Sequence, residues 1–128
     1  MRSAKRYWRD ECGAGAAEFA LVLIPFLALI FGIIGLSLML YANQTLHYAA
    51  EAAARCASVQ STTTCDTPAH IQAYATARYS GPVIAPVFAY TAGGCGPNGH
   101  TVGATATFPL RTGLVNVDVP LGATACFP

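Results

Sequence analysis

An uncharged apolar run from Phe19 to Ala42 constrains this chain more than any other feature of its sequence. As an α-helix the run would be about 36 Å long, and the hydrocarbon core of a bilayer is about 30 Å thick. The helices of soluble proteins are usually apolar on one face only, whereas this run is apolar all round. The sequence therefore predicts a transmembrane helix, in which Pro25 is tolerated and Tyr41 fits an interfacial anchor.

The charged residues predict the orientation of this helix. They make up 10% of the chain, against roughly 25% in ordinary soluble domains. Four of the seven basic residues precede the apolar run: Arg2, Lys5, Arg6 and Arg9. By the positive-inside rule, the N-terminus stays in the cytoplasm and the C-terminal part is exported. The net charge of +1, with no later basic patch, argues against nucleic-acid binding.

A cleaved secretory signal is the main alternative for the N-terminal region. Such signals have an apolar region of about 7 to 15 residues, which is shorter than the run found here. A site with small residues occurs around residues 47–49, but it falls inside a segment that also favours helix. We therefore expect the apolar helix to be retained.

The helix is expected to continue beyond the bilayer. Residues 43–58 are rich in alanine, the residue with the highest helix propensity. At helical spacing, one face of this segment carries Leu46, Ala50, Ala53 and Ala57. That face fits close packing against the exported domain or against another subunit, but it would also fit the plain stem of a membrane anchor.

The rest of the chain predicts a short helix packed on a small antiparallel sheet, an α+β fold. Thr67 and Pro68 match an N-cap and a first helical residue, and the pair Gly81–Pro82 should end that helix. Beyond it, apolar residues alternate with a period of two, as in half-buried strands. The expected strands cover residues 87–91, 102–108, 115–119 and 123–127, with a hairpin loop at residues 93–100.

Five cysteines add a redox argument. Cys12 falls before the membrane, on the reducing side, and the four exported cysteines can form disulfides. They are Cys56, Cys65, Cys95 and Cys126. Four cysteines allow three pairings, of which we favour Cys56–Cys65 and Cys95–Cys126. Because a domain of this size buries only a small core, such crosslinks would supply much of its stability.

The acidic residue Glu18 directly precedes the apolar run. A carboxylate there could simply be stabilised by the helix N-terminus at the membrane surface. The surrounding sequence RDECGAGAAEFALVL resembles the processing site of type IV prepilins, which a membrane peptidase cuts after a glycine on the cytoplasmic side. Cleavage after Gly13 would make Ala14 the first residue and Glu18 the fifth. Cleavage after Gly15 would make Glu18 the third, which the pattern disfavours.

The resemblance extends along the helix. The sequence resembles the TadE-like pseudopilins of tight-adherence (Flp-type) pilus systems. The matching features are the small residues before Glu18 and Phe19, Pro25 within the run, Tyr41 at its end, and the later alanines with Arg55. This resemblance implies a minor pseudopilin that contributes to pilus biogenesis, adherence and biofilm formation. Its implied partners are prepilin peptidase, other pilins and pseudopilins, and the bacterial inner membrane. It also implies that Glu18 pairs with the new N-terminal amine of a neighbouring subunit.

These inferences divide the chain into four parts. Residues 1–13 are a basic leader, 14–42 the transmembrane helix, 43–58 its periplasmic extension, and 59–128 a small disulfide-stabilised domain. The alternative is an unprocessed single-pass protein that binds or assembles components of the envelope.

Other chemistry is not expected. His70 and His100 could join the exported cysteines around zinc, but the spacing of known zinc motifs is missing. The string GGCGPNGH lacks the lysine of a phosphate-binding loop, and Ser80, His100 and Asp118 lack a nucleophile motif. We therefore expect no enzyme activity, no cofactor and no small-molecule substrate.

Overall fold

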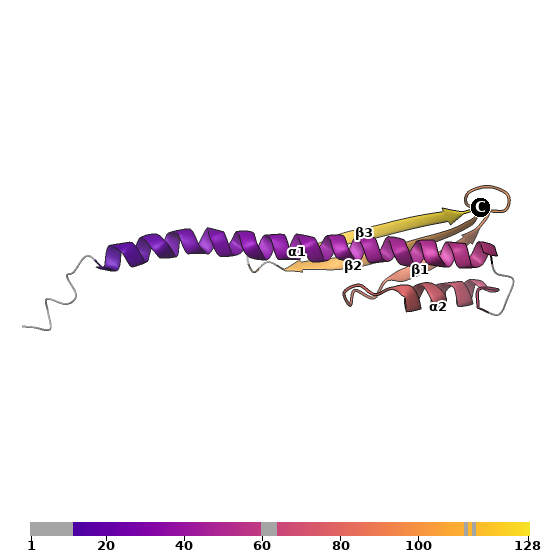
Figure 1. Ribbon diagram of the computed structural model, residues 1–128, viewed down its shortest axis with the longest axis horizontal. Coiled ribbons are helices and arrows are strands. Elements are labelled where there is room, and N and C mark those ends of the chain that lie inside the picture. The colour runs from indigo at the N-terminus through magenta and orange to yellow at the C-terminus, as the bar shows by residue number, and fades with distance from the viewer. Residues whose placement is uncertain (1–11, 60–63, 112, 114) are drawn as a thin grey trace, which may run out of the picture. The chain divides into compact units, whose positions relative to one another are not determined.

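The structure is a computed structural model that describes residues 12–59, 64–111, 113 and 115–128 (Figure 1). The elements are α1 (Cys12–Val59), α2 (Pro68–Arg78), β1 (Val87–Ala92), β2 (His100–Arg111) and β3 (Asn116–Phe127). The chain divides into two compact units, Met1–Ile34 and Gly35–Pro128, and α1 contributes to both. The basic residues of the predicted leader, Arg2, Lys5, Arg6 and Arg9, lie outside the described residues.

The first unit contributes the N-terminal part of α1. Its large apolar side chains are exposed, among them Phe19, Val22, Phe26 and Leu29. Within the described residues, α1 is the one helix that is long and apolar enough to cross a membrane by its length and composition. The expected long apolar helix is therefore present, and Pro25 lies inside it without ending it.

The second unit contains a three-stranded antiparallel sheet in the order β1-β2-β3. Phe88 pairs with Ala104, and Ala104 pairs with Ala123, so these buried residues lie on one face of the sheet. They form one core cluster with buried residues of α1 and α2. Both helices therefore cover the same sheet face, and the fold is the predicted α+β arrangement (Figure 1).

The alanine-rich part of α1 supplies more of this core than any other element, with seven of the seventeen buried residues that the structure describes there. Leu46, Ala50, Ala53 and Ala57 are all buried, as the spacing predicted, and Ala42, Ala49 and Ala54 join them. Small side chains allow a helix backbone to approach a sheet closely, which explains why alanine fills this face. Of the alternatives left open by the sequence, the structure shows packing against the rest of the same unit.

The short helix α2 begins as predicted. The Thr67 hydroxyl accepts a hydrogen bond from the backbone N–H of His70, 3.3 Å away, and Pro68 occupies the first turn. The helix ends at Arg78, slightly before Gly81–Pro82, because Tyr79 has an extended backbone and caps it. The Tyr79 hydroxyl then donates a 2.8 Å hydrogen bond to the carbonyl oxygen of Pro82.

The sheet differs from the prediction at its last strand. The two strands expected at residues 115–119 and 123–127 are one continuous strand, β3, which pairs with β2 from Asn116↔Arg111 to Phe127↔His100. Pro120 and Gly122 lie between the two expected strands and do not interrupt β3. An edge strand tolerates proline because one side of it has no neighbouring strand that requires an N–H donor, and β3 lies at the edge of this sheet.

Candidate processing and assembly site

The predicted cleavage site lies in the first turn of α1. The helix begins at Cys12, so the bond between Gly13 and Ala14 falls where backbone N–H groups have no partner within the helix. Gly13 and Gly15 are exposed, and no neighbouring atom lies within 4 Å of where a Cβ would stand at either position. The described residues therefore leave the backbone at this site uncrowded.

The helix also fixes the relation between Ala14 and Glu18. Residues four apart are neighbours on one helix face, so a new amino group at Ala14 would lie one turn from the Glu18 carboxylate. Glu18 and Phe19 are both exposed, Phe19 by 67%. The carboxylate is thus accessible to a cationic group from the same chain or from another one.

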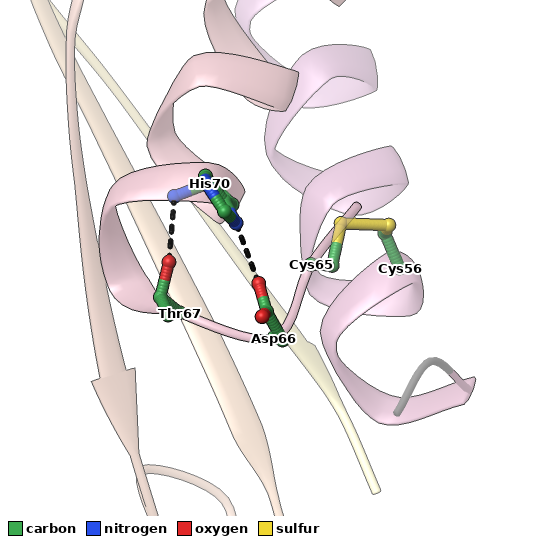
Figure 2. Close-up of polar contacts among 5 residues, drawn as sticks. All are labelled: Cys56, Cys65, Asp66, Thr67 and His70. Atoms are coloured by element: carbon green, nitrogen blue, oxygen red, sulfur yellow. Dashed lines mark hydrogen bonds and ion pairs between the residues drawn. A yellow bond between two sulfur atoms is a disulfide. The ribbon is translucent and has the colours of Figure 1, made fainter. Parts of the chain in front are cut away.

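Two disulfides crosslink the second unit. They join Cys56 to Cys65 and Cys95 to Cys126, with Cα–Cα distances of 6.0 and 6.1 Å, and these are the pairs favoured from the sequence. The first connects the C-terminal end of α1 to the segment before α2 (Figure 2). The second connects the loop between β1 and β2 to the end of β3.

An ion pair lies beside the first disulfide. Figure 2 shows the His70 ring directed at the Asp66 carboxylate, with Nδ1 2.5 Å from Oδ1. The hydrogen bond from His70 lowers the pKa of Asp66 below its ordinary value of 3.8. Because Thr67 caps the same turn, the two residues that follow the buried Cys65 both help to fix the start of α2.

Ser80, His100 and Asp118 do not form a catalytic triad in the structure. The Nδ1 atom of His100 lies 2.6 Å from the Tyr90 hydroxyl, and the carbonyl oxygen of Ser80 accepts a hydrogen bond from Tyr41. In the β2–β3 ladder, His100 of β2 is opposite Phe127, whereas Asp118 of β3 is opposite Pro109, about 30 Å further along. Within residues 12–59, 64–111, 113 and 115–128, no three His, Cys, Asp or Glu side chains gather as metal ligands would.

An open groove of about 810 Å³ is lined by α1, α2 and β3. The Arg78 guanidinium lies 4.9 Å from the ring centre of Tyr74, and that of Arg55 lies 5.7 Å from the ring centre of Phe127. Both pairs line the groove, together with Tyr48. It therefore offers aromatic surfaces and two cations to a binding partner.

Some contacts were not predicted from the sequence. The spacing of Asp66 and His70, four residues apart around an N-cap, was a local signal that could have revealed their pair. The contact between Gly35 and Leu110 joins residues far apart in the chain, and so does the hydrogen bond from Tyr41 to Ser80. No local pattern carries such information.

One comparison with known proteins gives a match to part of the chain. Residues 13–55 match the family described as TadE-like protein. The match begins at Gly13 and ends at Arg55, so it covers the predicted cleavage site, the apolar run and most of the alanine-rich face. It confirms the resemblance inferred from the sequence. No curated protein and no solved structure matches the chain.

Proposed function

From this TadE-like segment, which associates the chain with pilus machinery in general, we propose that the protein is a minor pseudopilin of a tight-adherence (Flp-type) pilus assembly system. It is inserted in the bacterial inner membrane with its N-terminus in the cytoplasm and the unit after the membrane in the periplasm. Prepilin peptidase cuts it after Gly13. The mature chain works with other pilins and pseudopilins in pilus biogenesis, and the output is surface adherence and biofilm formation.

The observation that carries this proposal is the coincidence of three features at one end of α1. The family match starts at Gly13, the glycine at that position is uncrowded, and Glu18 follows at the fifth position of the mature chain. Cleavage there removes the basic leader and retains the whole apolar helix. An anchored protein with no processing step has no need for this arrangement.

Glu18 acts as a registry residue in this proposal. Proteolysis creates a positive amino group at Ala14, and the nearby carboxylate of an adjoining subunit neutralises it. Near lipid, the attraction between opposite charges is stronger than in water, and it must offset the cost of removing both charges from water. A subunit displaced along its neighbour would leave both charges unpaired, so the pair selects one axial position.

The folded unit after the membrane favours a minor component over the main filament subunit. Major Flp-type pilins are much shorter after processing, whereas this chain continues after the apolar helix with a second helix, a sheet and two disulfides. The proposed role is structural and involves no catalysis and no cofactor.

Substitution of Glu18 by glutamine tests the registry role. Glu18→Gln keeps the size of the side chain and removes its charge, so we expect normal membrane insertion and loss of incorporation into the pilus machinery. Glu51→Gln is the matched control, because Glu51 is exposed on the same helix but lies outside the apolar run. Both variants are compared by crosslinking to other pilins in intact cells. Normal crosslinking of Glu18→Gln would refute the role of the carboxylate.

The groove favours one alternative, an unprocessed membrane-anchored protein that binds or assembles envelope components. Its arginine–aromatic pairs would then form the binding surface. Arg78→Ala separates the two functions. It should abolish activity in the binding protein and leave prepilin processing and pilus assembly largely unchanged in the pseudopilin.

A further inference from the structure

The end of the β2–β3 hairpin projects beyond the rest of the sheet. β1 pairs only with residues 100–105 of β2, while the β2–β3 ladder continues to Arg111 and Asn116. Figure 1 shows this two-stranded extension running along α1 past α2 and β1. Four of the described residues near its end are called here the hairpin end: Leu110, Arg111, Val115 and Val117.

The hairpin end contacts α1 within the apolar run. A Cβ added at Gly35 would lie only 2.9 Å from Cδ1 of Leu110, so the glycine allows the close approach of the hairpin. Gly35 and Leu110 both belong to the unit Gly35–Pro128. Because the uncharged run continues to Ala42, the hairpin lies beside a helix segment whose own composition suits lipid.

Counting along the helix places this contact at the edge of the hydrocarbon core. A membrane-crossing helix needs about 20 residues, and a span that starts at Phe19 therefore ends near Leu38. Gly35 falls about 4.5 Å before that end. Leu110, in contact with Gly35, consequently lies at the depth where acyl chains give way to headgroups.

The exposed side chains at this level are apolar. Leu36, Leu38 and Leu40 are each about half exposed on α1. On the hairpin, Val117 is paired with Leu110 and is 47% exposed, and Val115 is 52% exposed. Leaving such surface in water costs about 25 cal/mol per Å², whereas contact with acyl chains removes that cost.

Arg111 is exposed, pairs with Asn116 and is one residue beyond Leu110 toward the turn, so it lies slightly deeper than Leu110. Its stem can lie along apolar surface while its guanidinium reaches back to bind a lipid phosphate through two hydrogen bonds. Asp118, also exposed, is further from the end, opposite Pro109. The cation therefore lies closer to the bilayer than the carboxylate.

We propose that the hairpin end inserts into the outer lipid interface of the membrane crossed by α1, as a second and shallower membrane contact. The inference rests on the proposed membrane span. The proposed binding partners of the apolar hairpin end are phospholipid acyl chains and phosphates.

Tryptophan fluorescence with brominated lipids tests the proposal on the full chain. Trp8 is the single tryptophan, so Trp8→Phe provides a silent background. Val117→Trp then reports on the hairpin end, and Val115→Trp repeats the measurement at a neighbouring position. Each protein is reconstituted in phosphatidylethanolamine–phosphatidylglycerol vesicles with and without acyl-chain bromination. We expect brominated lipid to quench most of the emission of both hairpin variants.

Two matched probes make the outcome decisive. Leu29→Trp reports on the membrane span, and Val59→Trp lies at an exposed position about 36 Å along α1 from Gly35. The proposal expects quenching at Leu29→Trp and none at Val59→Trp. Quenching at Leu29→Trp without quenching at the hairpin positions overturns the hairpin inference alone, whereas no quenching at Leu29→Trp overturns the membrane span and the inference with it.

A second copy of the chain could also cover the hairpin end. In that case the hairpin tryptophans would emit at shorter wavelength without being quenched, and the shift would disappear when the protein is diluted with excess lipid. This result would also overturn the proposal.

Discussion

The Tyr41 hydroxyl donates a hydrogen bond to the carbonyl oxygen of Ser80, 3.1 Å away. The bond connects the end of the apolar run on α1 to the segment that follows α2. Close by, the side chains of Thr45 and Tyr79 would both clash with a Cβ at Gly81, so this segment lies tightly against the helix. An aromatic side chain expected to anchor the helix at the membrane surface therefore also holds the folded unit.

Removing this hydroxyl should weaken the folded unit slightly. Tyr41→Phe retains the ring and loses one hydrogen bond, so we expect the free energy of unfolding to fall by about 0.5–1.5 kcal/mol. Tyr48→Phe is the control, since Tyr48 is an exposed tyrosine on the same helix. Urea unfolding of both variants in detergent, followed by circular dichroism, measures the difference. Equal stability of the two variants would argue against the bond.

The two disulfides should contribute unequally to stability. Their sequence separations are 9 and 31 residues, for which chain entropy predicts about 2.7 and about 3.7 kcal/mol. Replacing Cys95 and Cys126 by serine should therefore be more destabilising than replacing Cys56 and Cys65, by about 1 kcal/mol. Urea unfolding of the two double variants checks the order. A larger loss for the Cys56–Cys65 pair would contradict it.

The buried alanines should not accept larger residues. Ala75 on α2 is fully buried, so Ala75→Leu overfills the core and should cost about 1–3 kcal/mol. Ala73→Leu, at an exposed position of the same helix, should change stability by less than about 0.5 kcal/mol. Thermal unfolding of the pair separates packing from helix propensity. Similar melting temperatures would mean that this face is less tightly packed than described.

The Asp66–His70 pair should make stability dependent on acid pH. The folded state lowers the pKa of Asp66, so the stabilisation is present above the ordinary value of 3.8 and is lost as the pH falls through the lowered pKa. His70→Ala removes the hydrogen-bond donor that is the main cause of the shift and should reduce this acid-side loss. Melting temperatures from about pH 6 to about pH 2 cover the relevant range. An unchanged acid profile in His70→Ala would contradict the assignment.

Local sequence signals predicted the elements that local physics determines. The Thr67–Pro68 pair marked the start of α2, and alanine spacing marked the face of α1 that is buried. The favoured cysteine pairs are those present in the structure, since each joins segments that the expected elements bring close.

Tertiary context decided what the sequence missed. Pro120 is a strand breaker in most settings, but it is accepted within β3 because that strand lies at a sheet edge. The extension of the β2–β3 ladder beyond β1 depends on pairing between distant residues, and so does its contact with Gly35. The candidate processing site, in contrast, is encoded within a few consecutive residues and was predicted from them.

The most direct test of the account is the intact mass of the protein purified from membranes of a host with active prepilin peptidase. The account predicts a mature chain that begins at Ala14, with Glu18 as its fifth residue. A chain that still carries residues 1–13, or one that begins at Ala16 after cleavage at Gly15, would contradict it.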